Sequence, residues 1–216
     1  MWSLLAGLAL SADSGKPHPH SGVLPRPPQP PVPPALSAED LVKLARGEPV
    51  LRQMQDKSGE DAGGQGVAVL DIHAEPAAIW ALLTDFDKYE DRVPNVMTCE
   101  VLEHVGDTYK VHFVIGIPLV PIEYWVVDTF RPEQGYLTWT LDYAKSSDFD
   151  DTTGFWLVEP IPDKPGWSRA WYSVRVKARG WVPAPIEAAF SRFGLTRSTE
   201  WLKREAERGS ASAPPR

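Results

Sequence analysis

Residues Ile79–Val101 read IWALLTDFDKYEDRVPNVMTCEV, a stretch in which a helical pattern is followed by a strand pattern. Pro76, just upstream, suits the first turn of a helix because the N–H that proline lacks would be unpaired there. Apolar residues at helical spacing follow it, Asp85–Asp87 ends this helix, and a second short helix is expected over Lys88–Arg92. Beyond Pro94 the apolar residues recur with a period of two, which is typical of strands. The stretch therefore predicts two short helices that lead into a β-sheet.

The rest of the chain extends this pattern on both sides. Upstream, Ser37 followed by Asp40 is similar to a capping box and predicts a short helix that ends at Gly47. Strands are expected at Glu48–Asp56, Gly66–Ile72, Met97–Val105, Tyr109–Ile115, Ile122–Phe130, Leu137–Tyr143, Gly154–Glu159 and Ser168–Lys177. A long helix over Ala184–Glu207 comes last. Strands segregated from helices in this way predict an α+β fold with an antiparallel sheet.

The composition limits the class of protein. The 216 residues carry a formal charge of −7, which argues against a nucleic-acid binder because phosphate contacts need clustered Lys and Arg. The single cysteine, Cys99, excludes an internal disulfide and any cysteine-based zinc or iron–sulfur site. No apolar run is long enough to span a bilayer. With 43% hydrophobic residues the chain can build a core, so we expect a soluble acidic domain.

Four segments are expected along the chain. Residues 1–12 are apolar and are similar to an export signal that lacks its basic start, so the sequence leaves an exported and a cytoplasmic protein equally open. Residues 13–35 are rich in proline and predict a disordered linker, or alternatively a ligand for a proline-binding groove, with His18 and His20 solvated. Residues 36–208 are the expected domain, and residues 209–216 a second disordered end.

The last helix is expected to cover the sheet. Four of its residues recur at spacings of four, three and four and so share one stripe: Ile186, Phe190, Phe193 and Arg197. An antiparallel sheet with one polar face must bury its other face, and this helix is the available cover. A bent sheet around a long helix leaves a space that is either filled by side chains or kept for a ligand.

The stretch quoted above resembles the START-like, or SRPBCC, superfamily, in particular its polyketide cyclase/dehydrase and coenzyme Q-binding branch. The shared positions are a helix aromatic, an Asp-aromatic pair, a tyrosine and a proline, here Trp80, Asp85, Phe86, Tyr89 and Pro94. Further matches are LTW at 137–139, GFWL at 154–157 and WVP at 181–183. The resemblance implies a helix-grip fold. In that fold a bent antiparallel sheet wraps around a long C-terminal helix, with the two short helices near the N-terminal end of the domain and a deep apolar cavity inside.

In a fold of this kind, alternate strand residues face the cavity. The candidate ligand-binding residues are Phe113, Ile115, Tyr124, Trp139, Leu141, Trp156 and Tyr172 on the strands and Phe190, Phe193 and Arg197 on the last helix. The register of the Ile122–Phe130 strand stays open, because Tyr124/Val126 and Trp125/Val127 are equally apolar. The aromatic residues either surround a ligand or fill a core. Arg197 either holds a carboxylate or phosphate head group or pairs with an acid at the rim.

The sequence carries no motif of a serine hydrolase, a zinc peptidase or a phosphate-binding loop. We interpret Asp148–Asp151 as a solvated acidic loop and Cys99 as a small buried residue. We therefore expect binding or transfer of a hydrophobic small molecule (a lipid, sterol, quinone or polyketide-like compound) rather than catalysis. The alternative is a polyketide cyclase or aromatase that uses the same cavity, with Tyr124, Tyr172 or Arg197 as acid or base.

The expected partners follow from this function. Gly116–Pro121 and Ala178–Pro185 are rich in glycine and proline and carry apolar residues, so they are candidates for a gate that contacts a membrane transiently. We expect a monomer that uses no cofactor and binds no metal and no nucleic acid. A third alternative, an interaction module that presents the cavity mouth to a protein partner, is compatible with the proline-rich segment.

Overall fold

The computed structural model describes residues 15–55, 63–116, 121–179, 195–196 and 199–209. Within them, eight strands form one antiparallel sheet in the order β1-β2-β8-β7-β6-β5-β4-β3. The strands are β1 (Val50–Gln55), β2 (Gly63–Ile72), β3 (Val96–Val105), β4 (Thr108–Gly116), β5 (Pro121–Arg131), β6 (Tyr136–Leu141), β7 (Phe149–Pro160) and β8 (Ser168–Ala178). The helices are α1 (Ala38–Ala45), α2 (Pro76–Leu83) and α3 (Tyr89–Arg92), with 3₁₀ turns η2 (Phe86–Lys88) and η3 (Pro132–Gln134). Residues 195–196 and 199–209 are also helical, and we refer to them as the C-terminal helix.

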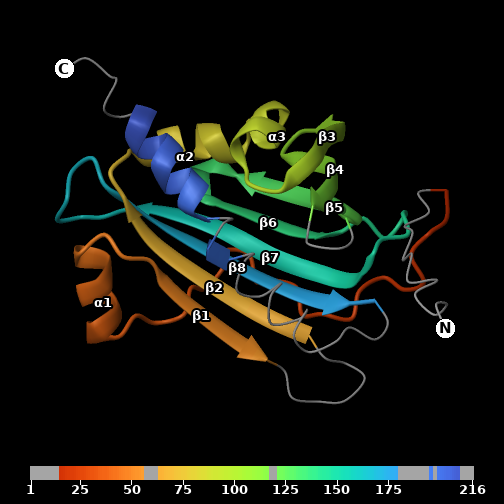
Figure 1. Cartoon of the computed structure of the whole chain (residues 1–216), viewed down its shortest axis with the longest axis horizontal. Coiled ribbons are helices and arrows are strands. Elements are labelled where there is room, and N and C mark those ends of the chain that lie inside the picture. Colours follow the sequence, from red (N-terminus) through yellow and green to blue (C-terminus); the bar gives the residue numbers. More distant parts are fainter. Residues whose placement is uncertain (1–14, 56–62, 117–120, 180–194, 197–198, 210–216) are drawn as a thin grey trace, which may run out of the picture.

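The connection between β2 and β3 spans the whole sheet. β2 pairs with β1 and β8, whereas β3 forms the opposite edge, and the chain between them contains α2, η2 and α3. From β3 onward each strand pairs with the next, until β8 returns beside β2. In Figure 1, α2, α3 and the blue C-terminal helix are grouped above the bent sheet, while orange α1 lies apart from them beside β1. The predicted α+β fold with an antiparallel sheet and a C-terminal helix is confirmed.

The inner face of the sheet packs against α2 and the C-terminal helix. The helix residues of this core are Ile79, Trp80, Leu83, Trp201, Leu202 and Ala206. Leu195 contacts the sheet at Gly66 of β2, where even a Cβ atom would lie 2.7 Å from the leucine side chain. The buried residues Leu195, Thr199, Leu202 and Ala206 recur at spacings of four, three and four. The stripe predicted for this helix is a different set, and all of its members lie outside the described residues.

The outer face of the sheet has a core of its own. It contains Leu44 of α1 together with strand residues Val50, Val67, Val69, Tyr136, Phe155, Leu157 and Trp171. Ser37 caps the start of helix α1, and its hydroxyl and backbone N–H exchange hydrogen bonds with Asp40, so the predicted capping box is confirmed. None of the described helices is long and apolar enough to cross a membrane.

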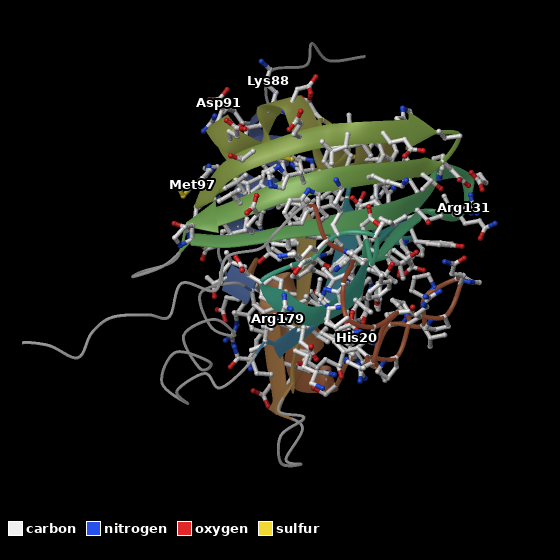
Figure 2. All side chains as sticks on the ribbon, turned by 90° about the vertical axis from the view of Figure 1, so that its right-hand side faces the viewer. His20, Lys88, Asp91, Met97, Arg131 and Arg179 are labelled. Atoms are coloured by element: carbon white, nitrogen blue, oxygen red, sulfur yellow. The ribbon has the colours of Figure 1, made fainter. Side chains whose placement is uncertain are left out.

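The proline-rich N-terminal segment lies on this outer face. The sequence predicts a disordered linker over residues 13–35, whereas residues 15–35 make hydrogen bonds to β6, β7 and the loop between them. His18 N donates to Tyr143 O, the Thr153 hydroxyl donates to Pro25 O, and the Gln29 amide donates to the Thr138 hydroxyl. Hydrogen bonds with hydroxyl and carbonyl groups of the strands therefore take the place of the regular backbone hydrogen bonds that a proline-rich chain cannot form. In Figure 2 the red segment runs in front of the blue-green strands.

Asp151 anchors the N-terminal segment from the start of β7. Its side chain is fully buried, and one carboxylate oxygen accepts hydrogen bonds from Val23 N and Leu24 N at 2.7 and 2.8 Å. The other oxygen accepts the Tyr143 hydroxyl at 2.8 Å. The interpretation of Asp148–Asp151 as a solvated loop is therefore wrong. β7 begins at Phe149, five residues earlier than the predicted strand, because Phe149 and Asp151 already pair with Ala178 and Lys177 of β8.

We predict that Asp151→Asn lowers the free energy of unfolding by about 2 kcal/mol, because a charged acceptor of three hydrogen bonds becomes a neutral one. Urea unfolding measures this loss, and hydrogen exchange should show faster exchange at Val23 and Leu24. Asp163→Asn, at an exposed carboxylate, is the matched control. Unchanged exchange at Val23 and Leu24 in the Asp151 variant would show that the carboxylate does not hold the segment.

A second prediction concerns Gly154 of β7. The Trp139 ring lies over this glycine, and an added Cβ would sit 2.1 Å from the ring and 2.3 Å from the backbone oxygen of Ser173. Gly154→Ala should therefore reduce stability by about 3 kcal/mol, the upper end for overpacking, because a backbone carbonyl cannot move aside. Gly209→Ala, which has open space around it, should be close to neutral. Equal unfolding midpoints for both variants would contradict the close contact of Trp139 with β7.

Candidate functional site

Six of the predicted ligand-binding residues lie together in the inner-face core. They are Phe113, Ile115, Tyr124, Trp139, Trp156 and Tyr172. Leu141 is also buried, and it lies on β6 directly across from Val126 of β5. The other three predicted residues, Phe190, Phe193 and Arg197, lie outside the described residues. The strand alternation therefore places the described candidates on one face.

The structure decides the register of β5. Tyr124 and Val126 belong to the inner-face core, whereas Trp125 stacks on His112 of β4 with ring centroids 4.7 Å apart. The inner face of β5 therefore continues with Asp128 and Phe130, because alternate residues share a face. This alternation places a carboxyl group in the apolar wall.

Asp128 is the residue that the sequence analysis missed. It is 5% exposed, and it lies between Tyr109 of β4 and Trp139 of β6 in the strand register. Among the described residues, no group donates a hydrogen bond to its carboxyl and no cation pairs with it. Buried carboxyl groups are almost always paired, so this one stands out. The sequence does place Asp128 two residues after Val126, so the two residues share one face of the strand. This spacing identifies Asp128 as an inner-face residue only when Val126 is known to point inward.

Burial raises the pKa of Asp128 to about 8, because no described group compensates for the lost hydration of the carboxylate. At neutral pH the group is therefore mostly a neutral acid, which has an O–H to donate and a carbonyl oxygen to accept. A neutral carboxyl in an apolar wall can form hydrogen bonds with a ligand carbonyl or hydroxyl. It can also exchange a proton near neutral pH.

Other titratable groups lie near Asp128 on the same side. Burial raises the pKa of Tyr124, Cys99 and Tyr89, and the charge of Asp128 adds to each of these shifts. The Tyr89 hydroxyl donates to Leu83 O at 2.7 Å, so this tyrosine has a structural partner. Cys99 is a buried free cysteine, as predicted, and the raised pKa keeps its thiol protonated. Tyr124, whose ring packs between Phe113 and Phe149, is therefore the second polar candidate of the site.

Aromatic rings form much of the wall around these groups. Tyr172 lies between two tryptophans, with ring centroids 5.7 Å from Trp139 and 4.6 Å from Trp156. Trp139 is the cross-strand neighbour of Asp128, so the carboxyl lies at the edge of this aromatic group. Such a wall offers a large apolar contact area with few polar positions, which is the usual form of a site for an apolar ligand.

A separate groove of about 680 Å³ lies between α2 and the β5–β6 connection. It is bordered by Trp80 and Phe130, but also by exposed groups such as Glu133 and Glu159, and it is open to solvent. Neither Asp128 nor any predicted ligand residue lines it. We therefore place the candidate site at the inner face around Asp128, where the apolar wall and the buried acid coincide.

Comparisons with known proteins show the family and the fold. The model of a family described as "Polyketide cyclase / dehydrase and lipid transport" matches residues 66–207. A search of curated protein sequences finds no match. Among solved structures, the Zhui aromatase/cyclase from Streptomyces sp. R1128 is 13% identical, with a TM-score of 0.58 over 76% of this chain and 100% of that one.

Two further structures have the same fold. A START superfamily protein from Mycobacterium smegmatis is 16% identical, with a TM-score of 0.57 over 67% of this chain and 97% of that one. Human StAR-related lipid transfer protein 5 is 12% identical, with a TM-score of 0.57 over 80% of this chain and 94% of that one. These likenesses confirm the helix-grip, START-like fold that the resemblance implied, and they leave the ligand open.

The buried acid leads to a prediction about pH. With an ordinary pKa of 3.8 in the unfolded chain and about 8 in the folded one, Asp128 takes up a proton on folding at pH values between these two. Stability should therefore fall as pH rises from about 4 to 8, by about 1.4 kcal/mol per pH unit from this group. Asp128→Asn should remove this contribution, so the variant should gain stability relative to the ligand-free wild type as pH rises.

Urea unfolding at several pH values between about 5 and 8 tests this prediction, since the difference between the two proteins isolates one group. Asp91→Asn, at an exposed carboxylate of α3, is the control and should give a curve parallel to that of the wild type. Parallel curves for Asp128→Asn as well would mean that the carboxyl is solvated or paired in solution.

Proposed function

We propose that this chain, which belongs to the polyketide cyclase/dehydrase and lipid transport family, binds one hydrophobic small molecule on the inner face of its sheet beneath the C-terminal helix. The observation that supports this proposal most is Asp128, a buried acid with no partner among the described residues, in a wall of aromatic and aliphatic side chains. A core made only for stability gains nothing from such a group. A bound ligand that forms a hydrogen bond with the Asp128 carboxyl would give this group a function.

The energetics favour a ligand with an apolar body and a polar atom. Each Å² of apolar surface that leaves water contributes about 25 cal/mol, so the body of the ligand supplies most of the affinity. An unpaired buried polar group costs about 1–3 kcal/mol, and a ligand carbonyl or hydroxyl that bonds Asp128 would recover this cost. Quinones, sterols, fatty acyl chains and polyketides all combine these two features. A molecule without a hydrogen-bonding atom should bind more weakly.

Exchange of the ligand would need an opening in the protein. The loops expected to form the gate, Gly116–Pro121 and Ala178–Pro185, lie mostly outside the described residues. They remain our candidates for transient contact with a membrane, because their sequences carry apolar residues between glycines and prolines. We propose that the protein acts as a monomer in this exchange.

The inner face also supports a second candidate function, a cyclase or aromatase. Such an enzyme needs at least two convergent polar groups, and Asp128 has Tyr124, Cys99 and Tyr89 as titratable neighbours. An acid with a pKa of about 8 could donate a proton to a carbonyl and take one back at neutral pH. Binding remains our first proposal, because the pKa values of Tyr124 and Cys99 are raised and neither is activated as a base.

The first test is native mass spectrometry of the full chain purified from its own host, followed by organic extraction of whatever is bound. We expect one apolar molecule per chain, with at least one carbonyl or hydroxyl oxygen. The affinity of that molecule is then measured for Asp128→Leu and Asp128→Asn. The leucine variant should bind about tenfold more weakly, and the asparagine variant, which still donates and accepts, should stay close to the wild type.

The opposite outcomes are equally clear. A chain that carries nothing and takes up no apolar fluorescent probe would mean that the aromatic residues fill the inner face as a core. Equal affinity for all three proteins would show that Asp128 does not contact the ligand. Turnover of a polyketide-like thioester that is lost in Asp128→Asn would favour the cyclase.

A further inference from the structure

A group of side chains far from the inner face has an unexplained polar atom. His18 and His20, on the N-terminal segment, meet Asp150 at the start of β7, and one ligand atom from each lies within 4.8 Å of the other two. The interpretation of both histidines as solvated is wrong for His18, which is 6% exposed. His20 and Asp150 are partly exposed, so the group can be reached from solvent. Figure 2 labels His20 on the red segment, with Arg179 on the same side of the molecule.

His18 is oriented in the way that a metal-binding histidine usually is. Its Nε2 lies 2.7 Å from the backbone oxygen of Asp150 and must donate, because a carbonyl oxygen can only accept. The proton is therefore on Nε2, and Nδ1 keeps its lone pair. Nδ1 is buried and has no hydrogen-bond partner. Histidines that bind metals usually donate one ring N–H to a carbonyl or carboxylate in this way, which orients the other nitrogen as the ligand.

The other two members of the group face each other. His20 Nε2 lies 3.1 Å from Asp150 Oδ1, and the two histidine rings have centroids 4.6 Å apart. Lys177 Nζ lies 3.2 Å from the other carboxylate oxygen, Oδ2. The contacts with His20 and Lys177 hold the carboxylate of Asp150 beside the two histidines.

We propose that His18 Nδ1, His20 Nε2 and Asp150 Oδ1 bind a divalent transition-metal ion that ties the N-terminal segment to β7. Two imidazoles and one carboxylate suit Zn²⁺, Cu²⁺ or Ni²⁺ rather than Ca²⁺, which prefers six or more oxygen ligands. Three protein ligands leave at least one position for water. An ion pair between His20 and Asp150 alone would explain two of these residues, but not the free lone pair of His18.

Binding requires only small local changes. Gly22 N donates to His20 Nδ1, so in the metal-free chain the ring proton is on Nε2 and points to Asp150. The ion takes the place of this proton. The Nε2 proton of His20 is released to solvent, and His20 Nδ1 takes up a proton in its place. The exposed N–H of Gly22, which donated to this Nδ1, then forms a hydrogen bond with water instead. Lys177 and Arg179, which lie near Asp150 and His18, oppose the charge of the ion, so we expect moderate rather than very tight affinity.

The test is calorimetric titration of Zn²⁺ into the full chain, prepared without a polyhistidine tag. We expect one Zn²⁺ per chain, and a loss of affinity of about tenfold or more in His18→Ala, His20→Ala and Asp150→Asn. Cu²⁺ should give an electron paramagnetic resonance spectrum with coupling to imidazole nitrogen from two histidines. His104→Ala, at an exposed histidine of β3, is the control and should bind like the wild type.

Asp151→Asn distinguishes the loss of a metal ligand from the detachment of the N-terminal segment. The substitution weakens the attachment of the segment at Val23 and Leu24 but keeps all three proposed ligands. It should retain the imidazole signature of Cu²⁺ even if its Zn²⁺ affinity falls. The proposal is overturned if Zn²⁺ does not bind, or if it binds as tightly to the His18→Ala/His20→Ala double variant. Ca²⁺ binding that survives in that double variant would assign the site to the carboxylates of 148–151 instead.

Discussion

The sheet is apolar on both faces along β7 and β8, and the rest of the architecture depends on covering both. Consecutive residues of each strand are buried on opposite faces: Phe155 and Trp171 lie in the outer core, while Trp156 and Tyr172 lie in the inner core. Strands buried on both sides carry continuous apolar runs instead of alternation. The C-terminal helix and α2 cover one face, and α1 with the proline-rich segment covers the other, so that segment is part of the fold.

Two of the polar groups that have no partner among the described residues lie on opposite sides of this double cover. Asp128 sits in the inner wall, and His18 Nδ1 sits where the N-terminal segment meets β7. Each costs stability, whereas the buried carboxylate of Asp151 accepts three hydrogen bonds. We relate both costs to binding, of an apolar molecule at the first and of a metal ion at the second.

The two proposed sites are linked through β7. The inner face of this strand carries Trp156, whose ring packs on Tyr172 in the aromatic wall, and its first residues carry Asp150 and Asp151 on the side of the N-terminal segment. A change that loosens the segment would act on the strand that supports the ligand wall. The relatives of known structure include an aromatase/cyclase and a lipid transfer protein, so the same framework serves more than one chemistry.

Local pattern was enough to predict the sheet, the capping box at Ser37 and six residues of the inner wall, because alternation and caps depend on near neighbours in the chain. It was not enough for β5, where two registers were equally apolar, and so Asp128 was missed. The docking of residues 15–35 and the burial of Asp151 were missed for a related reason. Most of their hydrogen-bond partners are more than 100 residues away in the chain. Only the assembled sheet brings the carboxylate of Asp151 and the hydroxyl of Thr153 to backbone groups of the proline-rich segment, which cannot form a regular strand ladder.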